Sequence, residues 1–328
     1  MLLFRLLGFD LGDETFLYSV FGAIIILFLL LDLGVFNKEA HKITTRSALI
    51  QSVFWVFVST LFGIMILFLD HDPESGGTKG AVEYFSAYLT EYALSVDNIF
   101  VILLILKYFN VKEEYFHKIL FWGILGAVVF RGVFIFVGAL LIQQFHWILY
   151  IFGVLLIYSG IKIYFEDSDE KIDPEKNPVL RLCRKYLPLS PTDEGGKFVI
   201  TKPKFMFTPL FLVIVLIETT DLIFAVDSIP AAFAITQNEF LIYTSNIFAV
   251  LGLRAMFFML SGIIDRFHLL QKGLSVILFF IGAKMLLEIF HIEFPPLLSF
   301  SVIIATLTLS IIFSIVLPKR KPKSEELT

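Results

Sequence analysis

The chain has one cysteine and few charged residues. Because Cys183 is the only cysteine among 328 residues, the chain can form neither an internal disulfide nor a cluster of thiolate metal ligands. Charged residues make up 17% of the sequence and form no basic surface, which argues against binding to nucleic acid. A Gly-x-x-x-x-Gly-Lys-Ser/Thr phosphate-binding loop is also missing. We therefore predict a protein that is not an enzyme and has no organic cofactor.

Apolar residues dominate what is present. The sequence is 57% hydrophobic and contains 38 Phe, and its mean hydropathy is +0.84, which is typical of a protein embedded in a lipid bilayer. An apolar run of about 20 residues is long enough to cross the hydrocarbon layer as a helix. The sequence therefore predicts an all-α, polytopic transmembrane helix bundle with about nine spans, at 16–36, 48–69, 84–107, 118–142, 146–165, 207–234, 239–264, 273–291 and 296–317.

A polar stretch at 166–206 separates two groups of spans. It contains several prolines and the pair Gly195-Gly196, a composition typical of a linker. We therefore expect a single integral membrane domain over residues 1–328. Within it, the sequence predicts two units and two accessory segments around the linker, with the units at 84–165 and 207–291 and the accessory spans at 16–69 and 296–317.

Positive charge is distributed unevenly between the two sides of the predicted bundle. The segments after odd-numbered spans hold 20 of the 26 Lys and Arg residues, whereas the segments on the other side hold only Arg5 and Lys79. Loops rich in Lys and Arg stay in the cytoplasm. We therefore predict a multi-pass protein of a bacterial-type inner (plasma) membrane, with its N-terminus outside and its C-terminus in the cytoplasm.

Two predicted spans carry carboxylates in a matching pattern. Glu91-Tyr-Ala-Leu-Ser-Val-Asp97-Asn98-Ile in one span aligns with Asp221-Leu-Ile-Phe-Ala-Val-Asp227-Ser228-Ile in the other. Ionised groups are costly inside a membrane, so a segment that contains two of them, and then recurs, indicates a functional site.

The match between the two units extends beyond the acids. Each acidic span is followed by a span with an arginine, Arg131 or Arg254, and then by a Gly-x-Lys sequence that ends at Lys162 or Lys284. Since the first span of one unit runs inward and that of the other runs outward, the pattern predicts an inverted repeat of two three-helix units. We expect such a repeat to bring Asp97 and Asp227 together near the bilayer centre.

The spacing of the acids restricts how they reach one ion. Glu91 and Asp97 are six residues apart, which places them about 120° apart on a straight helix, whereas Glu91, Ser95 and Asn98 share a face. Each acidic helix must therefore either sit as a wedge between two partners or unwind locally. Pro230 favours unwinding in the second copy, because it cannot donate a hydrogen bond within the helix.

The candidate ligands are all oxygen donors, and the cores of the two acidic spans hold no His or Cys. Oxygen ligands suit Mg²⁺, Ca²⁺ or Mn²⁺. The sequence predicts a divalent metal site. Its candidate ligands are Asp97, Asp227, Glu91, Asp221, Glu218, Asn98 and Ser228. Protons are the expected counter-ion, because clustered carboxylates can exchange a metal ion for protons.

A structural interpretation competes with the metal site. In it, the acids form buried ion pairs with Arg131 and Arg254 that only hold the helices together. Five acids against two deep arginines argue against complete neutralisation. A mixed arrangement is also open, in which the arginines balance the charge of some carboxylates while others bind the ion.

Several motifs resemble the TerC family of integral membrane proteins, which is named for tellurium resistance and includes the Alx-type manganese exporters. The resemblance rests on these segments: Asp32-Leu-Gly-Val-Phe-Asn37-Lys-x-Ala-His41, Glu91-Tyr-x-Leu-Ser-Val-Asp97-Asn98, Arg131-x-x-Phe-Ile, Glu218-x-Thr-Asp221-x-x-Phe-Ala-Val-Asp227-Ser228-Ile-Pro230 and Asn246-Ile-Phe-Ala-x-Leu-Gly-Leu-Arg254. It implies a bacterial inner membrane protein that exports manganese. We therefore expect export of Mn²⁺ as the transported substrate, driven by an ion gradient. The alternatives are export of tellurite or another small solute, and a non-transporting membrane scaffold that helps exported proteins to fold or acquire metal.

Overall fold

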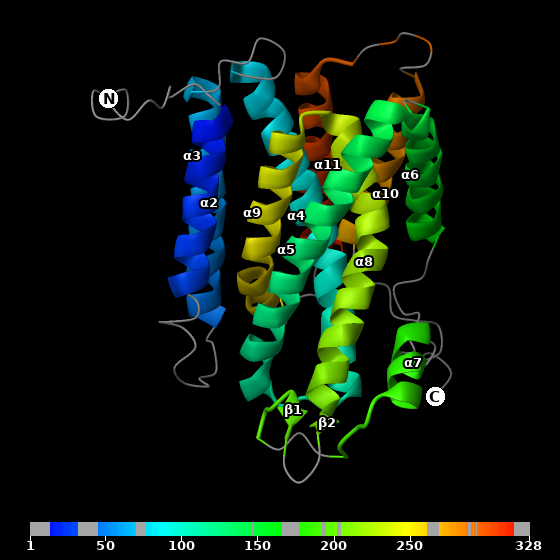
Figure 1. Ribbon diagram of the computed structural model, residues 1–328. Helices are drawn as coiled ribbons and strands as arrows, with labels where there is room; N and C mark the ends of the chain where they lie inside the picture. Colours follow the sequence, from blue (N-terminus) through cyan, green and yellow to red (C-terminus); the bar gives the residue numbers. More distant parts are fainter. Residues whose placement is uncertain are drawn as a thin grey trace, which may run out of the picture.

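The computed structural model is a bundle of long helices that run alongside one another (Figure 1). It describes residues 14–31, 45–69, 77–145, 147–165, 177–191, 195–201, 205–260, 269–287, 290, 292 and 294–317. Among these residues, eight helices are long and apolar enough to cross a membrane. The predicted fold class, an all-α polytopic bundle, is confirmed.

Nine long helices follow the predicted spans in order, with one short helix between the two groups. Their bounds are α2 Glu14–Leu31, α3 Thr45–Leu69, α4 Gly77–Tyr108, α5 Glu113–Gln144, α6 Ile148–Phe165, α7 Pro178–Tyr186, α8 Pro209–Ile235, α9 Glu239–Leu260, α10 Leu270–Leu287 and α11 Pro296–Val316. Helix α2 corresponds to the first predicted span, and its apolar part is the shorter stretch Leu17–Leu27. Residues 32–36 of that predicted span lie outside the described part of the chain.

Helices α4 and α9 form the centre of the bundle. Helix α4 packs against α3, α8, α9 and α11, and α9 packs against α3, α4 and α5. Aromatic side chains fill the contact with the first helices, since Phe62 of α3 lies between Phe21 of α2 and Phe248 of α9 with ring centroids 5.8 and 5.0 Å away. Large apolar side chains on α3, α5 and α11 point outward, as expected for helices that face lipid.

The closest helix pair is α6 with α10, on the opposite side of the bundle from α2 and α3 (Figure 1). Small residues allow the two backbones to approach. A Cβ atom added at Gly160 would lie 2.8 Å from the carbonyl oxygen of Ser275, and one added at Gly282 would lie 2.7 Å from that of Gly153. Neither position has room for a side chain unless the helices separate.

The contacts at this crossing are reciprocal. The same sequence offset separates Gly153 from Ser275 and Gly160 from Gly282. Gly160 approaches the Ser275 carbonyl, and Gly282, at the matching position of α10, approaches the Gly153 carbonyl. The two helices are also antiparallel, since the residue numbers that meet rise along one and fall along the other. This local pattern is what an inverted repeat requires at α6 and α10, while the repeat over the full units 84–165 and 207–291 remains a prediction.

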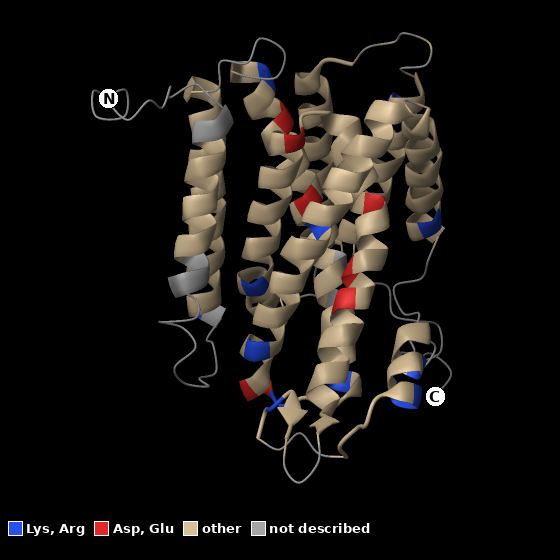
Figure 2. Cartoon of the chain, viewed as in Figure 1, with Lys and Arg blue, Asp and Glu red and all other residues tan. Residues whose placement is uncertain are grey.

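The linker contains two small elements that apolar runs do not reveal. Helix α7 begins where the Asn177 side chain accepts hydrogen bonds from the backbone N–H groups of Val179 and Leu180, at 2.8 and 3.3 Å. Strands β1 Val199–Ile200 and β2 Met206–Phe207 form a short antiparallel hairpin. Both elements lie at one end of the bundle, where Figure 2 shows blue segments on α5 and α7.

Candidate functional site

One face of α4 carries a row of buried polar side chains. Glu91, Ser95 and Asn98 recur at helical spacing and are 2%, 0% and 4% exposed. Helix α4 is continuous through this segment, so the face predicted from the spacing of these three residues is present. The row points into the bundle rather than toward lipid, as expected for polar groups that must find partners inside the protein.

Arg131 of α5 lies against this row and is itself only 1% exposed. Its Nη1 atom donates to Glu91 Oε1 of α4, and its Nη2 atom donates to Asp221 Oδ1 of α8 at 3.2 Å. The guanidinium group therefore bridges two carboxylates from two different helices. These two acids occupy matching positions in the two acidic segments, one six residues before Asp97 and the other six residues before Asp227.

Two amide side chains complete the surroundings of Arg131. Asn246 of α9 is fully buried, and its Oδ1 atom accepts from Arg131 Nη1 at 3.2 Å while its Nδ2 atom donates to the Ile242 carbonyl at 3.0 Å. Asn98 of α4 donates from Nδ2 to Asp221 Oδ1 at 3.2 Å. We call Glu91, Asn98, Arg131, Asp221 and Asn246 the Arg131 cluster; its members come from α4, α5, α8 and α9.

Several buried oxygen atoms at the Arg131 cluster have no hydrogen-bond partner among the described residues. They include Glu91 Oε2, Asn98 Oδ1 and Ser95 Oγ, and the Ser228 hydroxyl is close enough to the Glu91 carboxylate to donate a hydrogen bond. Buried polar groups are normally paired, because an unpaired one costs free energy. Carboxylate, amide and hydroxyl oxygens are the ligand types that a hard cation prefers, although the described residues include no group of three or more acidic, His or Cys side chains arranged to hold a metal ion.

Glu218 lies one helical turn before Asp221 on α8. Its carboxylate packs against Gly126 of α5, where an added Cβ atom would overlap it, and its Oε2 atom is buried with no partner among the described residues. Glu218 and Asp221 are close enough for their charges to interact. A glycine at position 126 therefore leaves the space that a third carboxylate occupies beside the Arg131 cluster.

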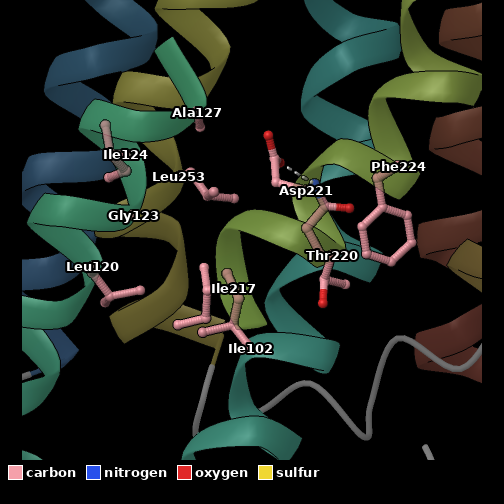
Figure 3. A pocket seen from close by; sticks show the side chains of 11 residues that line it. Ile102, Leu120, Gly123, Ile124, Ala127, Ile217, Thr220, Asp221, Phe224 and Leu253 are labelled. Atoms are coloured by element: carbon pink, nitrogen blue, oxygen red, sulfur yellow. Dashed lines mark hydrogen bonds between the residues drawn. The ribbon is translucent and has the colours of Figure 1, made fainter. Parts of the chain in front are cut away.

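A cavity of about 20 Å³ adjoins the cluster. Asp221 forms its polar end and points toward the space between α5 and α8, while Leu120 and Ile124 of α5 face it across the gap (Figure 3). The remaining lining is largely apolar and comes from α4, α5, α8 and α9. A water molecule needs roughly 10–15 Å³. The cavity can therefore admit a particle of the size of a water molecule or a small ion next to Asp221.

Asp227 is directed to a different neighbour. Its Oδ1 atom accepts a hydrogen bond from Ser159 Oγ of α6 at 2.6 Å, and Lys162 of α6 is close enough to interact electrostatically. Helix α8 continues through Pro230, so its two acids diverge because the helix is a wedge between α5 and α6 and not because it unwinds. The predicted unwinding at Pro230 is therefore absent, and Asp221 and Asp227 lie on different sides of α8 with different partners.

The described contacts do not place two further predicted site residues, Arg254 and Asp97. Arg254 lies two turns beyond Asn246 on α9 and is partly exposed. Asp97 lies within α4, but its side chain is outside the described part of the structure, so its expected approach to Asp227 remains a prediction. The motif from Asp32 to His41 also falls outside the described residues.

A second pair of buried charged residues occupies the opposite end of α8. Lys284 of α10 donates from Nζ to the Ala234 carbonyl at 3.1 Å, in the last turn of α8. Glu83 of α4 interacts there with Thr236 and lies within electrostatic range of Lys284. Lys284 is only 7% exposed, so its positive charge lies inside the bundle, where it favours the C-terminal end of α8.

Comparison with known proteins places this site in a family. The pattern that defines the integral membrane protein TerC family matches residues 76–322, which include every helix from α4 to α11. The chain belongs to the TerC family. The predicted resemblance is confirmed, and the protein is a multi-pass integral membrane protein.

Relatives match the TerC-family chain over nearly its whole length. A membrane protein of Myxococcus xanthus is 40% identical over 94% of this chain and 95% of its own. A membrane protein of Rickettsia bellii is 42% identical over 91% of this chain and 97% of its own. A protein of Escherichia coli described as the putative membrane-bound redox modulator Alx is 39% identical over 91% and 94%. No solved structure matches.

Sequence reasoning missed two polar residues of this region, Asn246 and Ser159. Both are uncharged, so neither forms part of an acidic pattern. An amide in the middle of a predicted span was nevertheless a usable signal for Asn246, because polar groups inside a membrane need a partner.

Proposed function

We propose that this protein is a transporter that exports a divalent metal cation, Mn²⁺ in particular, through the Arg131 cluster. The observation that carries the proposal is the surplus of buried carboxylate around one arginine. Glu91 and Asp221 share a single guanidinium group, and Glu218 lies one helical turn from Asp221 and close enough to interact with its charge. Glu91 and Glu218 each present a buried oxygen with no hydrogen-bond partner among the described residues. Membership in a family of integral membrane proteins supports a transport function.

The ligands we propose are those on the α4 and α8 faces beside the cavity. Glu91 and Asp221 supply negative charge, Asn98 and Ser228 supply neutral oxygens, and Glu218 is a further ligand or proton carrier. Carboxylate and carbonyl oxygens favour Mn²⁺, Mg²⁺ and Ca²⁺ over metals that prefer nitrogen or sulfur. Asp97 and Asp227 remain proposed ligands.

The proposed orientation in the membrane follows from charge. Lys112 and Lys118 on α5 lie toward the hairpin end, and Lys118 donates to the Gly196 carbonyl in the linker at 2.7 Å. If that end faces the cytoplasm of a bacterial inner membrane, as loops rich in Lys and Arg do, the N-terminus is outside and the C-terminus inside. Because the sequence lacks a phosphate-binding loop, we propose an ion gradient, with protons as counter-ion, as the energy source.

The test is metal flux in liposomes that contain the purified full-length protein. We expect the wild type to move Mn²⁺ across the membrane, and we expect Asp221→Asn and Glu91→Gln to abolish this flux at equal protein content. The matched control is Glu114→Gln on α5, because its carboxylate lies 3.8 Å from Lys112 and is 46% exposed. Wild-type liposomes that show no Mn²⁺ flux in either direction would contradict the proposal.

The same experiment separates the other candidate functions. Flux of tellurite without Mn²⁺ flux would identify an oxyanion exporter, and normal metal acquisition by exported proteins without any flux would identify a scaffold. The relatives described as putative redox modulators raise a third candidate. Since this chain has only Cys183, one copy cannot cycle between an internal dithiol and a disulfide, which favours the metal transporter.

A further inference from the structure

Arg131 occupies the position between the two carboxylates that a transported cation would also bind. Its two terminal nitrogens are divided between Glu91 and Asp221, so each acid receives one N–H group and not the paired contact that arginine and carboxylate form when alone. The Nε atom of Arg131 is buried with no partner among the described residues. The guanidinium group is therefore placed to neutralise two acids at once, at the expense of its own complete hydrogen bonding.

The neighbouring groups leave room for a second cation to approach. Glu91 Oε2 and Asn98 Oδ1 remain without partners among the described residues, and Asp221 borders the cavity. A divalent ion bound to these oxygens would lie close to the positive charge of Arg131. Two positive charges repel strongly in the interior of a protein, where bulk water does not screen them. Binding of the ion would therefore weaken the hold of the guanidinium group on Glu91 and Asp221.

A neutral acceptor holds Arg131 from the other side. Asn246 Oδ1 accepts from the same Nη1 atom that contacts Glu91, and the bond from Asn246 Nδ2 to the Ile242 carbonyl fixes the direction of the amide. If the guanidinium group releases a carboxylate, it keeps a hydrogen bond inside the protein. Two unneutralised carboxylates at this depth would be costly, so a tethered cation that returns when the ion leaves lowers the cost of the empty site.

We propose that Arg131 is a tethered counter-cation that competes with the transported divalent ion for Glu91 and Asp221 and replaces it after release. This inference rests on the proposed function, because it assigns a role to Arg131 in the same site. It makes Arg131 a residue that sets affinity and balances the charge of the two acids while the metal-free transporter returns, in addition to joining helices.

The test compares Mn²⁺ binding and transport in four purified full-length proteins, the wild type and three variants, in lipid nanodiscs and liposomes. Arg131→Gln removes the charge and retains hydrogen-bond donors, and Arg131→Lys retains a charge that reaches fewer acceptors. We expect the Kd for Mn²⁺ to fall by roughly 5- to 150-fold in Arg131→Gln, the usual range of coupling between two ligands, and by a smaller factor in Arg131→Lys. The control is Lys118→Gln, which removes a positive charge from the same helix about 20 Å away and should leave the Kd unchanged.

Transport provides a readout that a purely structural role would not produce. Arg131→Gln should lose net Mn²⁺ flux but keep the exchange of external for internal Mn²⁺, because exchange does not require the empty site to return. A Kd equal to or higher than that of the wild type in Arg131→Gln would overturn the proposal. If that variant does not fold, an unchanged or higher Kd in Arg131→Lys would overturn it.

The outcomes for the two proposals are distinct. Failure of the wild type to bind or move Mn²⁺ would contradict the transport function itself. Normal binding and flux in the wild type, without tighter binding in the Arg131 variants, would contradict only the counter-cation role.

Discussion

Two acids that are six residues apart on α8 lie on different sides of the helix and have different partners. On the side that faces α4, α5 and α9, Asp221 belongs to the Arg131 cluster, whose buried carboxylate and amide oxygens are incompletely paired. On the side that faces α6 and α10, Asp227 accepts a short hydrogen bond from Ser159. Close by, α6 and α10 cross through glycines with their backbones in contact.

The Arg131 cluster therefore has groups that can exchange partners, whereas the crossing of α6 and α10 is closely packed. Incompletely paired charges cost stability, and a protein retains them where a ligand or a moving side chain can use them. Close backbone packing through small residues stabilises helices in lipid without any charge. We therefore expect mutations on the first side to alter transport and mutations at the α6–α10 crossing to alter stability.

The largest expected effect is on the first side. Glu91→Gln removes a charge from a buried pair, so we expect it to lower the free energy of unfolding by about 3–5 kcal/mol in addition to abolishing transport. Denaturation of the purified protein in detergent measures the change. Glu114→Gln, at an exposed pair, should change stability by less than about 1 kcal/mol. Equal effects of the two variants would remove the distinction between buried and exposed pairs.

The hydrogen bond on the second side gives the next largest effect. Ser159→Ala removes the donor to Asp227, and we expect a loss of about 1.5–3 kcal/mol, as for other hydrogen bonds to charged groups. Binding of Mn²⁺ at the Arg131 cluster should be retained, which calorimetric titration can measure. Loss of Mn²⁺ binding in this variant would show that the two sides of α8 form one site.

The crossing of α6 and α10 should respond to added volume. We expect Gly282→Ala to destabilise the protein by about 1–3 kcal/mol, because the added methyl group meets the backbone of α6 and overpacks the crossing. Gly22→Ala on α2 is the control, since nothing lies within 4 Å of its Cβ position. Thermal unfolding of the two variants, compared with the wild type, tests the claim; a Gly282→Ala protein as stable as Gly22→Ala would contradict it.

The smallest expected effect concerns the placement of Glu218. The methyl group of Gly126→Ala would displace the flexible carboxylate without moving a backbone, so the fold should persist while the Kd for Mn²⁺ rises by up to about tenfold, or 1.4 kcal/mol. Gly252→Ala on α9 is the control, because its Cβ would make only ordinary contacts, 3.5 Å from Tyr92 and 3.6 Å from Trp55. Equal Mn²⁺ affinities in both variants would remove Glu218 from the proposed ligands.

The helices were predictable because apolar length alone determines which segments can cross a membrane. The residues at which the helices begin and end were less predictable. Helix α4 begins at Gly77, seven residues before the predicted span at 84–107, because its first turns include the charged Lys79 and Glu83. Such residues interrupt an apolar run without ending a helix. The hairpin and α7 in the linker are too short and polar to appear in a search for apolar runs.

At the site, local periodicity predicted the shared face of Glu91 and Asn98, because positions on one helix depend only on sequence spacing. The partners across helices did not follow from spacing. Whether Asp227 faces Ser159 or the Arg131 cluster depends on how α8 is rotated between α5 and α6, and that rotation is set by the packing of the whole bundle. The role of Asn246 as an acceptor for Arg131 likewise required the placement of α9 beside α5.

The most direct measurement of the central claim is the position of Mn²⁺ in crystals of the wild-type protein, found from its anomalous scattering. We predict one strong peak beside Glu91 and Asp221, from a Mn²⁺ ion ligated by oxygen atoms of α4 and α8. The Arg131 guanidinium should then be displaced toward Asn246. Crystals saturated with Mn²⁺ that show no peak within the bundle, with Arg131 still bridging both acids, would contradict it.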